Sequence, residues 1–512
     1  MDDEALEAAR ARLAQLRDDG VEPYPNGFTV SHTSEQVKAE FGDKLEAGET
    51  LEGSSVSFGG RLMFRNRMGK AMFLRVQDRG AHEGKESVEG ETKAGILQVY
   101  VRRDEIGDAS FARCRAFDIG DWIWVRGSVM RTKTGELSIQ AQEISLASKI
   151  LRTFPDRWHG VTDIEKRSRQ RYVDLFMNEQ TRITFHKRSR IVKYFRDFFH
   201  GRDFVEVETP MLQSIPGGAN ARPFVTHHNA LDIDLYMRIA PELFLKRLVV
   251  GGMERVFEIN RNFRNEGISV KHNPEFTMLE FYQAWATHND LMDLTEELLS
   301  GLVKEICGSY VIAFGDLELD FTPPFRRAPM DELIAEATGL DRGVLEDVSA
   351  LEAWWRENHR VADDEKLPQT WGKWWEWLYD AHVEDRLLNP TFVTSFPTEI
   401  SPLSRRNDED PTRVDRFEIV IARWEMGNAF SELNDPVDQQ ARFAAQERAR
   451  EAGDQESMFI DYDYVRALEY GMPPTAGMGI GIDRLTMLLT NQASIKEVIL
   501  FPTLRPEAGS HE

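Results

Sequence analysis

The chain has 512 residues, which is too long for one ordinary hydrophobic core and indicates two or more domains. Hydrophobic residues make up 41% of the sequence and charged residues 29%, and no apolar run approaches the ~18 residues of a membrane helix, so neither a disordered chain nor a membrane protein is expected. The net charge of −23 argues against a protein that coats nucleic acid indiscriminately, because such binding requires many Lys and Arg side chains.

The first fifty residues are predicted to form an N-terminal helix and a linker (residues 1–50). Apolar residues recur at helical spacing between Asp3 and Asp18, and the Gly- and Pro-containing stretch that follows ends the helix. The sequence begins MDDEALEAAR and lacks the basic and apolar regions of a signal peptide, so a cytoplasmic location is expected. Cys114 and Cys307 have no C-x-x-C partner and are expected to be buried thiols.

Five short alternating runs between residues 51 and 148 predict a small β-barrel. They lie at residues 56–62, 72–77, 96–101, 122–127 and 137–141. An OB-fold is the natural candidate, since its strand face can stack single-stranded bases. Five basic residues support this interpretation, although solvated surface charges are the alternative: Arg61, Arg65, Arg67, Lys70 and Arg75. The segment from Gly80 to Gly95 is predicted to be an inserted flexible loop.

Residues 149–512 are predicted to form one large domain. A helix is expected from Thr184 to His200, because apolar residues follow one side of it, and it leads into a strand within Gly201–Pro210. Both elements would be structural. The Trp-rich segment 351–388 gives no indication of a catalytic role.

The stretch Phe263-Arg-Asn-Glu-Gly267, followed by His272-Asn-Pro-Glu-Phe276, has the side chains of a nucleotide site. Arg264 can hold a phosphate through two parallel hydrogen bonds, and Phe276 can stack on adenine. Taken alone, the stretch could equally be a charged hairpin turn.

The stretch Gly477-Met-Gly-Ile-Gly-Ile-Asp-Arg-Leu485 predicts a strand followed by a helix. Glycines at every second position leave one strand face bare, so a flat group can lie against the backbone, and Arg484 can reach an anion at the helix start. A tightly packed strand without a ligand is the alternative.

In chain order, three elements resemble motifs 1, 2 and 3 of the class II aminoacyl-tRNA synthetases. They are the strand within Gly201–Pro210, the stretch 263–276 and the stretch 477–485. Four segments further resemble the lysine-specific branch of that family: RIAPELFLKRLVVGG, FEINRNFRNEGISVKHNPEFTMLEFYQAW, GNAFSELNDP and GMPPTAGMGIGIDRL. The resemblance runs from about residue 51 to the final FPTLRP. It implies an α+β protein with an N-terminal OB-fold for the anticodon and a catalytic domain built on an antiparallel sheet flanked by helices. It also implies a homodimer that forms through residues 184–210.

The resemblance assigns residues to ATP, metal and anticodon. Its ATP-binding set comprises Arg264, Glu266, His272, Phe276 and Arg484, with the two arginines as the catalytic residues on the phosphates. Glu418 and Glu425 match the acids that bind Mg²⁺, which favours carboxylate and phosphate oxygens. Phe73, Gln98 and Glu136 match the residues that contact anticodon bases.

Glu418 and Glu425 can share a site only if the chain turns between them. Seven residues along one continuous strand would place them on opposite faces, so a hairpin or a bulge is required. The family often has glycines at this turn, and this chain has Ala422 and Arg423 instead.

The resemblance also implies a pocket for lysine. Its residues are Gly218, Glu242, Glu280, Tyr282, Asn428, Phe430 and Glu432. Glu432 and Tyr282 would hold the ε-ammonium and Glu242 the α-amino group, with Gly218 along the substrate backbone. In the GNAF segment Ala429 replaces a glycine of the family, which would narrow the pocket slightly.

The expected function is therefore ATP-dependent activation of L-lysine to lysyl-adenylate, with release of pyrophosphate and transfer of lysine to the 3′ end of tRNA(Lys). One alternative is an aspartyl- or asparaginyl-type class II synthetase, but three acids in the pocket would repel aspartate. The other alternative is a non-catalytic RNA-binding relative, which would have no physical need for both phosphate arginines and both metal carboxylates.

Overall fold

The computed structural model describes residues 3–79, 95–154, 161–360, 366–451 and 459–507. Its contacts divide the chain into two compact units, Met1–His186 and Lys187–Glu512. The domain boundaries expected at residues 50 and 148 stay predictions. The insertion expected between Gly80 and Gly95 falls almost entirely outside the described residues.

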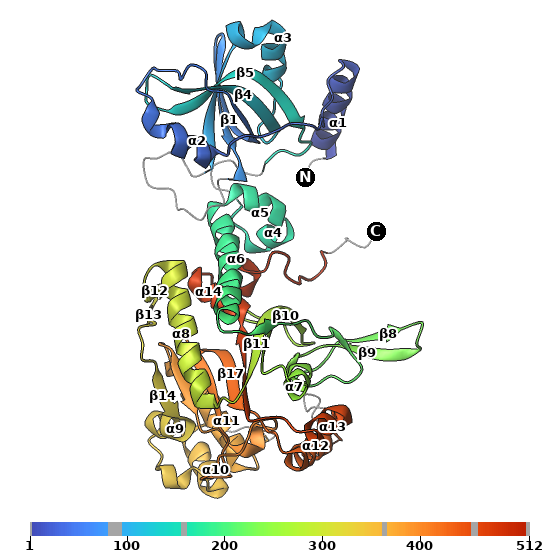
Figure 1. Cartoon of the computed structure of the whole chain (residues 1–512), viewed down its shortest axis with the longest axis vertical. Coiled ribbons are helices and arrows are strands. Elements are labelled where there is room, and N and C mark those ends of the chain that lie inside the picture. The colour runs from blue at the N-terminus through green and yellow to red at the C-terminus, as the bar shows by residue number, and fades with distance from the viewer. Residues whose placement is uncertain (1–2, 80–94, 155–160, 361–365, 452–458, 508–512) are drawn as a thin grey trace. The chain divides into compact units, whose positions relative to one another are not determined.

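The first unit contains a closed five-stranded barrel in the order β1-β2-β3-β5-β4, which confirms the OB-like expectation (Figure 1). The strands are β1 (Val56–Met68), β2 (Ala71–Gln77), β3 (Ile96–Arg102), β4 (Trp122–Arg131) and β5 (Leu137–Ser148). The helices are α1 (Asp3–Asp18), α2 (Ser34–Phe41), η1 (Gly42–Lys44), α3 (Arg103–Arg115), α4 (Ile164–Arg169) and α5 (Arg171–Met177). Alternate residues such as Leu74, Val76 and Val99 fill the barrel, because side chains of a strand point to opposite faces.

Helix α6 (Glu179–His200) leads into the second unit, which is built on an eight-stranded sheet in the order β14-β15-β16-β17-β18-β11-β10-β6. Those strands are β6 (Val205–Glu206), β10 (Arg255–Phe263), β11 (Glu275–Ala284), β14 (Arg326–Pro329), β15 (Thr391–Thr394), β16 (Arg416–Ile421), β17 (Trp424–Ser431) and β18 (Thr475–Gly481). The edge pairs β14–β15 and β6–β10 are parallel and the others antiparallel, so the sheet is mixed rather than purely antiparallel.

The remaining elements of this unit surround the large sheet or form smaller sheets. The small sheets contain β7 (Leu212–Gln213), β8 (Val225–His228), β9 (Ile233–Met237), β12 (Val311–Phe314) and β13 (Leu317–Asp320). The helices are α7 (Glu242–Val250), α8 (His288–Cys307), α9 (Met330–Thr338), α10 (Val348–Asn358), α11 (Trp371–His382), α12 (Pro436–Glu451), α13 (Tyr462–Glu469) and α14 (Ile482–Leu489). Single 3-10 turns are η3 (Arg342–Val344), η4 (Glu384–Arg386), η5 (Thr398–Ile400) and η6 (Ile495–Glu497).

The two faces of the large sheet have different roles. One face forms the main core with α6, α8 and α14, in which Leu279, Phe281 and Ile480 are fully buried. On the other face α7, α12 and α13 cover only part of the sheet, around Val256 and Tyr282. Strand residues that point to this second face between the helices are therefore available to line a cavity.

The turn between β16 and β17 consists of Ala422 (φ 51°) and Arg423 (φ 68°). Both residues lie in the left-handed region, as a two-residue hairpin turn requires, and their amides donate to the carbonyls of Leu388 and Leu387 at 2.8 Å. The expected hairpin therefore forms without glycine. The left-handed conformation costs a side-chain-bearing residue roughly 1 kcal/mol.

Arg423→Gly is accordingly expected to stabilise the second unit by about 1 kcal/mol, because glycine adopts a positive φ at no steric cost and keeps the amide donor. Thermal unfolding monitored by calorimetry measures the change. Arg448→Gly, the same replacement within helix α12, is the control and should lower the stability by about as much. Equal destabilisation by both variants would contradict the account of the turn.

Candidate active site

A cavity of about 500 Å³ opens on the second face of the large sheet. It is lined by nearly all the residues predicted for the ATP, metal and lysine sites: Gly218, Glu242, Arg264, Glu266, His272, Phe276, Glu280, Tyr282, Glu418, Glu425, Asn428, Phe430 and Arg484. The one exception is Glu432, which is fully buried directly behind this lining. The sequence therefore identified residues that fold into one place, although their roles stay predictions.

Strand register assembles the floor of the cavity in two rows across four strands. One row contains Glu280, Gly479, Asn428 and Glu418, which are direct cross-strand partners on β11, β18, β17 and β16. The next row contains Tyr282, Gly477, Phe430 and Arg416 on the same strands. Directly opposite residues share a sheet face, so residues far apart in the sequence meet in fixed positions.

Arg264 and Arg484 both face the cavity, and burial together with the like charge of Arg484 lowers the pKa of Arg264. The Nε of Arg264 is buried without a hydrogen-bond partner among the described residues, and the guanidinium lies 5.2 Å from the centre of the Phe276 ring. Arg484 donates to the backbone carbonyl of Glu425 at 2.6 Å. Two guanidinium groups facing one cavity, one of them with a donor unpartnered in the described part of the chain, form a site suited to a polyphosphate.

His272 lies against Arg484, with 3.0 Å between the His272 Nε2 and the Arg484 Nη2. Burial and the charge of Arg484 lower the pKa of His272 to about 4, so the ring is neutral at physiological pH. Because the guanidinium can only donate, Nε2 must accept and Nδ1 carries the proton toward the Ser269 Oγ at 2.8 Å. The ring thus fixes one arginine without adding positive charge.

Glu418 and Glu425 both line the cavity because the chain makes a hairpin between them and a bulge after Ile419. Burial and then the charge of Glu425 raise the pKa of Glu418 to about 8, although Arg416 donates to Glu418 at 2.5 Å. This excess of negative charge fits a divalent cation. The described residues contain no group of three or more His, Cys, Asp or Glu side chains that could hold a metal, so phosphate oxygens would have to complete the ligand set.

The Trp-rich segment 351–388 also contributes acids to the cavity lining, which the sequence did not indicate. Trp374 and Trp375 of α11 are fully buried in a separate apolar cluster, whereas Glu376, Asp380 and Glu384 face the cavity. Burial, together with Glu376 and Glu384, raises the pKa of Asp380 to about 6. The end of the cavity near Glu418 is therefore strongly acidic.

The acids of the predicted lysine pocket lie at the opposite, more enclosed end. Burial and the charge of Glu242 raise the pKa of Glu280 to about 8, and the Tyr282 hydroxyl donates to Glu280 at 3.4 Å. Glu432 lies behind this pair, and its Oε1 is buried without a hydrogen-bond partner among the described residues. A buried carboxylate oxygen in this state favours a cationic ligand.

Lys246 is the main residue of this region that the sequence analysis missed. It is fully buried on α7, and its Nζ lies 2.5 Å from the Glu242 Oε1 and forms an ion pair with Glu432. The only signal in the sequence was its position four residues after Glu242, which places both on one helix face. Asp483 was also missed; it ties the site to α6 through an ion pair with Arg188 at 2.6 Å.

Two glycines are required by close approach. Gly218 has φ 85°, and an added Cβ would lie 2.9 Å from the Glu242 Cβ. A Cβ on Gly477 would lie 2.2 Å from the Tyr282 ring and 2.4 Å from the Glu432 Oε1. Side chains of the pocket therefore cover part of the β18 face that the alternating glycines leave bare.

Gly477→Ala is expected to raise the KM for lysine by about 10²-fold or more, because the methyl group displaces Tyr282 and Glu432 and such small misplacements cost about this factor. Steady-state pyrophosphate exchange measures it. Gly481→Ala is the matched comparison, since its Cβ would meet nothing closer than 3.8 Å, and its effect should be far smaller. Equal effects of both variants would show that the pocket is not where Gly477 lies.

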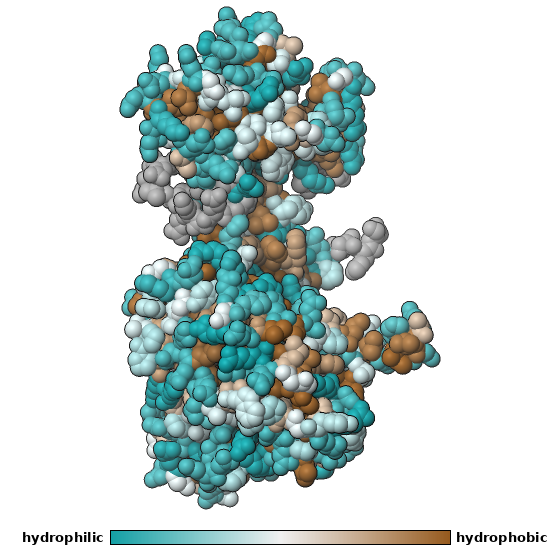
Figure 2. Space-filling model, viewed as in Figure 1, coloured by the Kyte–Doolittle hydropathy of each residue, from teal (hydrophilic) through white to brown (hydrophobic). Residues whose placement is uncertain are grey.

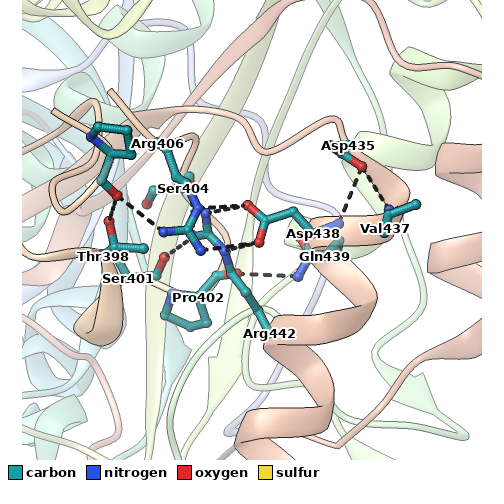
Figure 3. Close-up of polar contacts among 11 residues, drawn as sticks. Thr398, Ser401, Pro402, Ser404, Arg406, Asp435, Val437, Asp438, Gln439 and Arg442 are labelled. Atoms are coloured by element: carbon teal, nitrogen blue, oxygen red, sulfur yellow. Dashed lines mark hydrogen bonds and ion pairs between the residues drawn. The ribbon is translucent and has the colours of Figure 1, made fainter. Parts of the chain in front are cut away.

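Residues 401–404 form another wall of the cavity, and a polar network holds them in place (Figure 3). Arg442 of α12 donates to the backbone carbonyls of Ser401 and Ser404 at 2.9 and 2.8 Å, while Asp438 accepts from the same guanidinium at 2.8 Å. The Gln439 amide donates to the carbonyl of Pro402 at 3.3 Å. This wall is thus preorganised by contacts outside the cavity.

The three residues predicted to contact the anticodon lie in the first unit. Phe73 and Gln98 share the outer face of β2 and β3, where Phe73 stacks on Tyr100 with ring centres 4.7 Å apart. Glu136 immediately precedes β5, whose Ser138 accepts a hydrogen bond from Gln98 at 2.9 Å. Of the predicted basic patch, Arg61 and Arg65 donate to the backbone carbonyls of Gly120 and Arg115, so part of their donor capacity is used within the first unit.

Neither unit contains a helix that is both long and apolar enough to span a membrane, within the described part of the chain. Cys114 is buried and Cys307 is half-buried rather than fully buried as expected. Both are free thiols.

Comparison with known proteins agrees with this site. The family model of class II tRNA synthetases (D, K and N) matches residues 163–505. A lysine–tRNA ligase of Pelotomaculum thermopropionicum is 49% identical over 504 residues, covering 98% of this chain and 95% of the relative. Lysine–tRNA ligases of Dichelobacter nodosus (50% identity, 97% of each chain) and Enterobacter sp. (49%, 98% of this chain and 96% of the relative) are similarly close.

The family model includes aspartate, asparagine and lysine enzymes and does not separate them by itself. The full-length relatives do, because each carries the lysine-specific description at about half identity. The acids at the enclosed end of the cavity also favour lysine, because they would repel the carboxylate of aspartate. The chain therefore belongs to the lysine–tRNA ligases, within the class II tRNA synthetase family.

Proposed function

We propose that the cavity activates L-lysine with ATP and that its residues act as the sequence predicts. The lysine carboxylate attacks the α-phosphorus of ATP, forming the acyl-phosphate bond of lysyl-adenylate while the bond to pyrophosphate breaks. The ribose hydroxyl at the 3′ end of tRNA(Lys) then takes the lysine and releases AMP. One observation carries the proposal: Arg264 and Arg484 share a cavity with Glu242 and Glu280, and Glu432 lies just behind its lining.

The phosphate end needs charge compensation rather than a strong base, because an ionised carboxylate is already a competent nucleophile. Arg264 holds the α-phosphate in this proposal, and Arg484 the γ-phosphate. Phe276 stacks on the purine, while Glu266 and His272 orient the nucleotide. Mg²⁺ held by Glu418 and Glu425 would neutralise phosphate charge when bound.

The lysine end selects a doubly cationic amino acid. Glu242 binds the α-ammonium and Gly218 lies along the substrate backbone. Glu432 and Tyr282 bind the ε-ammonium, with Glu280, Asn428 and Phe430 as the sleeve. A neutral side chain would leave a buried carboxylate unpaired, a mismatch of about 3 to 5 kcal/mol.

Amino-acid-dependent exchange of pyrophosphate into ATP, with the twenty amino acids tested separately, tests the proposal. Lysine should give the dominant signal. Exchange driven by aspartate or asparagine would overturn the specificity, and no exchange with any amino acid would overturn the activity.

The first unit binds the anticodon in this proposal, through Phe73, Gln98 and Glu136. Stacking on an aromatic side chain contributes about 1 to 3 kcal/mol per base. We also propose a cytoplasmic location, which the free thiols of Cys114 and Cys307 support.

We propose the homodimer through residues 184–210 that the resemblance implies, and it is supported by apolar surface on the small sheet β7-β9-β8, which follows this segment in the chain and projects from the second unit (Figure 1). Leu212, Val225, Leu231 and Ile233 are all exposed there, and brown surface marks this projection in Figure 2. Val205 on the edge strand β6 is exposed as well. Light scattering coupled to size-exclusion chromatography should give the mass of two chains, and a monomer at micromolar concentration would contradict the proposal.

A further inference from the structure

Lys246 occupies the kind of environment that the pocket is expected to offer its substrate. Its side chain is fully buried, and its ammonium forms ion pairs with Glu242 and Glu432. The Nζ lies 5.2 Å from the centre of the Phe430 ring and 6.0 Å from those of Tyr282 and Tyr464. The protein thus contains its own ammonium within a cage of carboxylates and aromatic rings.

This ammonium is a fixed part of the fold. Helix α7 packs through Leu243, Leu245 and Val249 against the cluster beneath it. Lys246 does not line the cavity. Burial alone would lower the pKa of Lys246, but Glu242 and Glu432 together raise it above its ordinary value, so the side chain stays charged.

The carboxylate oxygens are divided between Lys246 and the cavity. Lys246 contacts the Oε1 of Glu242 and the Oε2 of Glu432. The Oε1 of Glu432 has no hydrogen-bond partner among the described residues and lies beside Gly477, which lines the cavity. Glu242 itself lines the cavity. Each acid therefore keeps one oxygen for a ligand after Lys246 has taken the other.

We infer that Lys246 is a positioning residue that determines specificity: it ties Glu242 and Glu432 into one rigid unit and leaves one oxygen of each for the two ammonium groups of the substrate. This inference rests on the proposed roles of the two acids. Because Lys246 holds one oxygen of each acid, the distance between the two remaining oxygens is fixed. The site therefore selects a substrate by the distance between its α- and ε-ammonium groups. Ornithine, one methylene shorter, cannot satisfy both.

Without Lys246 the distance between these two oxygens is no longer fixed, for two reasons. The two buried carboxylates repel each other, so one of them takes up a proton and stops binding an ammonium. The remaining side chains are also free to rotate toward a shorter substrate. Neither effect removes a contact of Arg264 or Arg484, because the ion pairs of Lys246 are with Glu242 and Glu432.

Lys246→Met keeps the length of the side chain and removes the charge. We expect the KM for lysine to rise about 10²-fold, because breaking one member of a buried ion pair is costly. The preference for lysine over ornithine should fall about tenfold, within the range one methylene confers. The KM for ATP should change less than about twofold, because no ATP contact is lost.

Lys149→Met is the matched control. Lys149 is also a buried ammonium between two carboxylates, with its Nζ 2.5 Å from Asp118 and 2.8 Å from Asp121, but it lies in the barrel. The Lys149→Met substitution should lower the stability of the first unit and leave the KM for lysine in pyrophosphate exchange unchanged.

Chemical rescue separates charge from packing. Lys246→Ala removes the atoms of one propylammonium ion, so added propylammonium should restore the low KM for lysine and 1-propanol should not. In the wild type the same cation can only compete with lysine. Rescue by both compounds equally would assign Lys246 to packing and overturn the inference.

The inference would also fall if folded Lys246→Met kept both the wild-type KM for lysine and the preference over ornithine. That result differs from failure of the proposed function, in which the wild type itself would show no lysine-dependent exchange. Thermal unfolding of both lysine variants establishes that the proteins compared are folded.

Discussion

Arg264→Ala is expected to lower kcat/KM for lysine-dependent pyrophosphate exchange by about 10³-fold or more, the effect of removing a preorganised donor to a transferring phosphoryl group. The Arg264 guanidinium is held beside the Phe276 ring, and its Nε has no hydrogen-bond partner among the described residues. This Nε–H is therefore not committed to another described part of the protein, which lowers the reorganisation needed before the guanidinium binds phosphate oxygens. Exchange kinetics at saturating lysine measure the loss.

Two comparisons sharpen this result. Arg264→Lys keeps the charge but not the planar pair of donors, so it should restore only part of the rate. Arg261→Ala removes a nearby arginine that pairs with Glu275 at 2.7 Å outside the cavity, and its rate should stay close to wild type. A rate for Arg264→Ala within tenfold of wild type would remove Arg264 from the chemical step.

Glu432→Gln is expected to abolish the preference for lysine while leaving ATP binding largely intact. The variant keeps the volume and removes the negative charge that Lys246 and the substrate ammonium would share. Loss of one member of a buried ion pair costs about 3 to 5 kcal/mol, which corresponds to a rise of about 10²- to 4 × 10³-fold in the KM for lysine. Exchange kinetics with lysine and separate titration with ATP measure the two effects.

Asp331→Asn is the matched control for this variant. Asp331 is also a buried carboxylate, paired with Arg342 and Arg413, but it does not line the cavity. It should lower the stability without changing the KM for lysine. Unchanged lysine kinetics for Glu432→Gln would place the ε-ammonium elsewhere.

Local patterns explain why much of the fold could be predicted. Helix α1 begins and ends at the predicted residues because its apolar positions follow helical spacing. Strand β18 and helix α14 follow the glycine alternation and the apolar run after Asp483. The barrel strands were found for the same reason, although each extends further than its alternating stretch.

Elements that the sequence does not predict, or predicts as longer than they are, lack such a pattern. Helix α3 buries only Phe111 and Cys114, and it contains Gly107 with a non-helical conformation, so no periodic signal marks it. The strand expected within residues 201–210 is only Val205–Glu206, because this edge strand pairs with β10 through just two residues.

The site was predictable as a set of residues but not as a geometry. Motif resemblance identified the two arginines and the acids, whereas the cross-strand rows follow from register, which no local stretch specifies. The ion pair of Lys246 with Glu432 joins α7 to the end of β17, and the acids of α11 face the cavity from a segment dominated by tryptophan. These contacts arise only from tertiary packing.

A crystal structure of the protein with lysine, a non-hydrolysable ATP analogue and Mg²⁺ tests the central claim most directly. The account predicts both guanidinium groups, Arg264 and Arg484, on the triphosphate and the ε-ammonium of lysine on the Oε1 of Glu432. A triphosphate that touches neither arginine, or a lysine side chain that points away from Glu432, would contradict it.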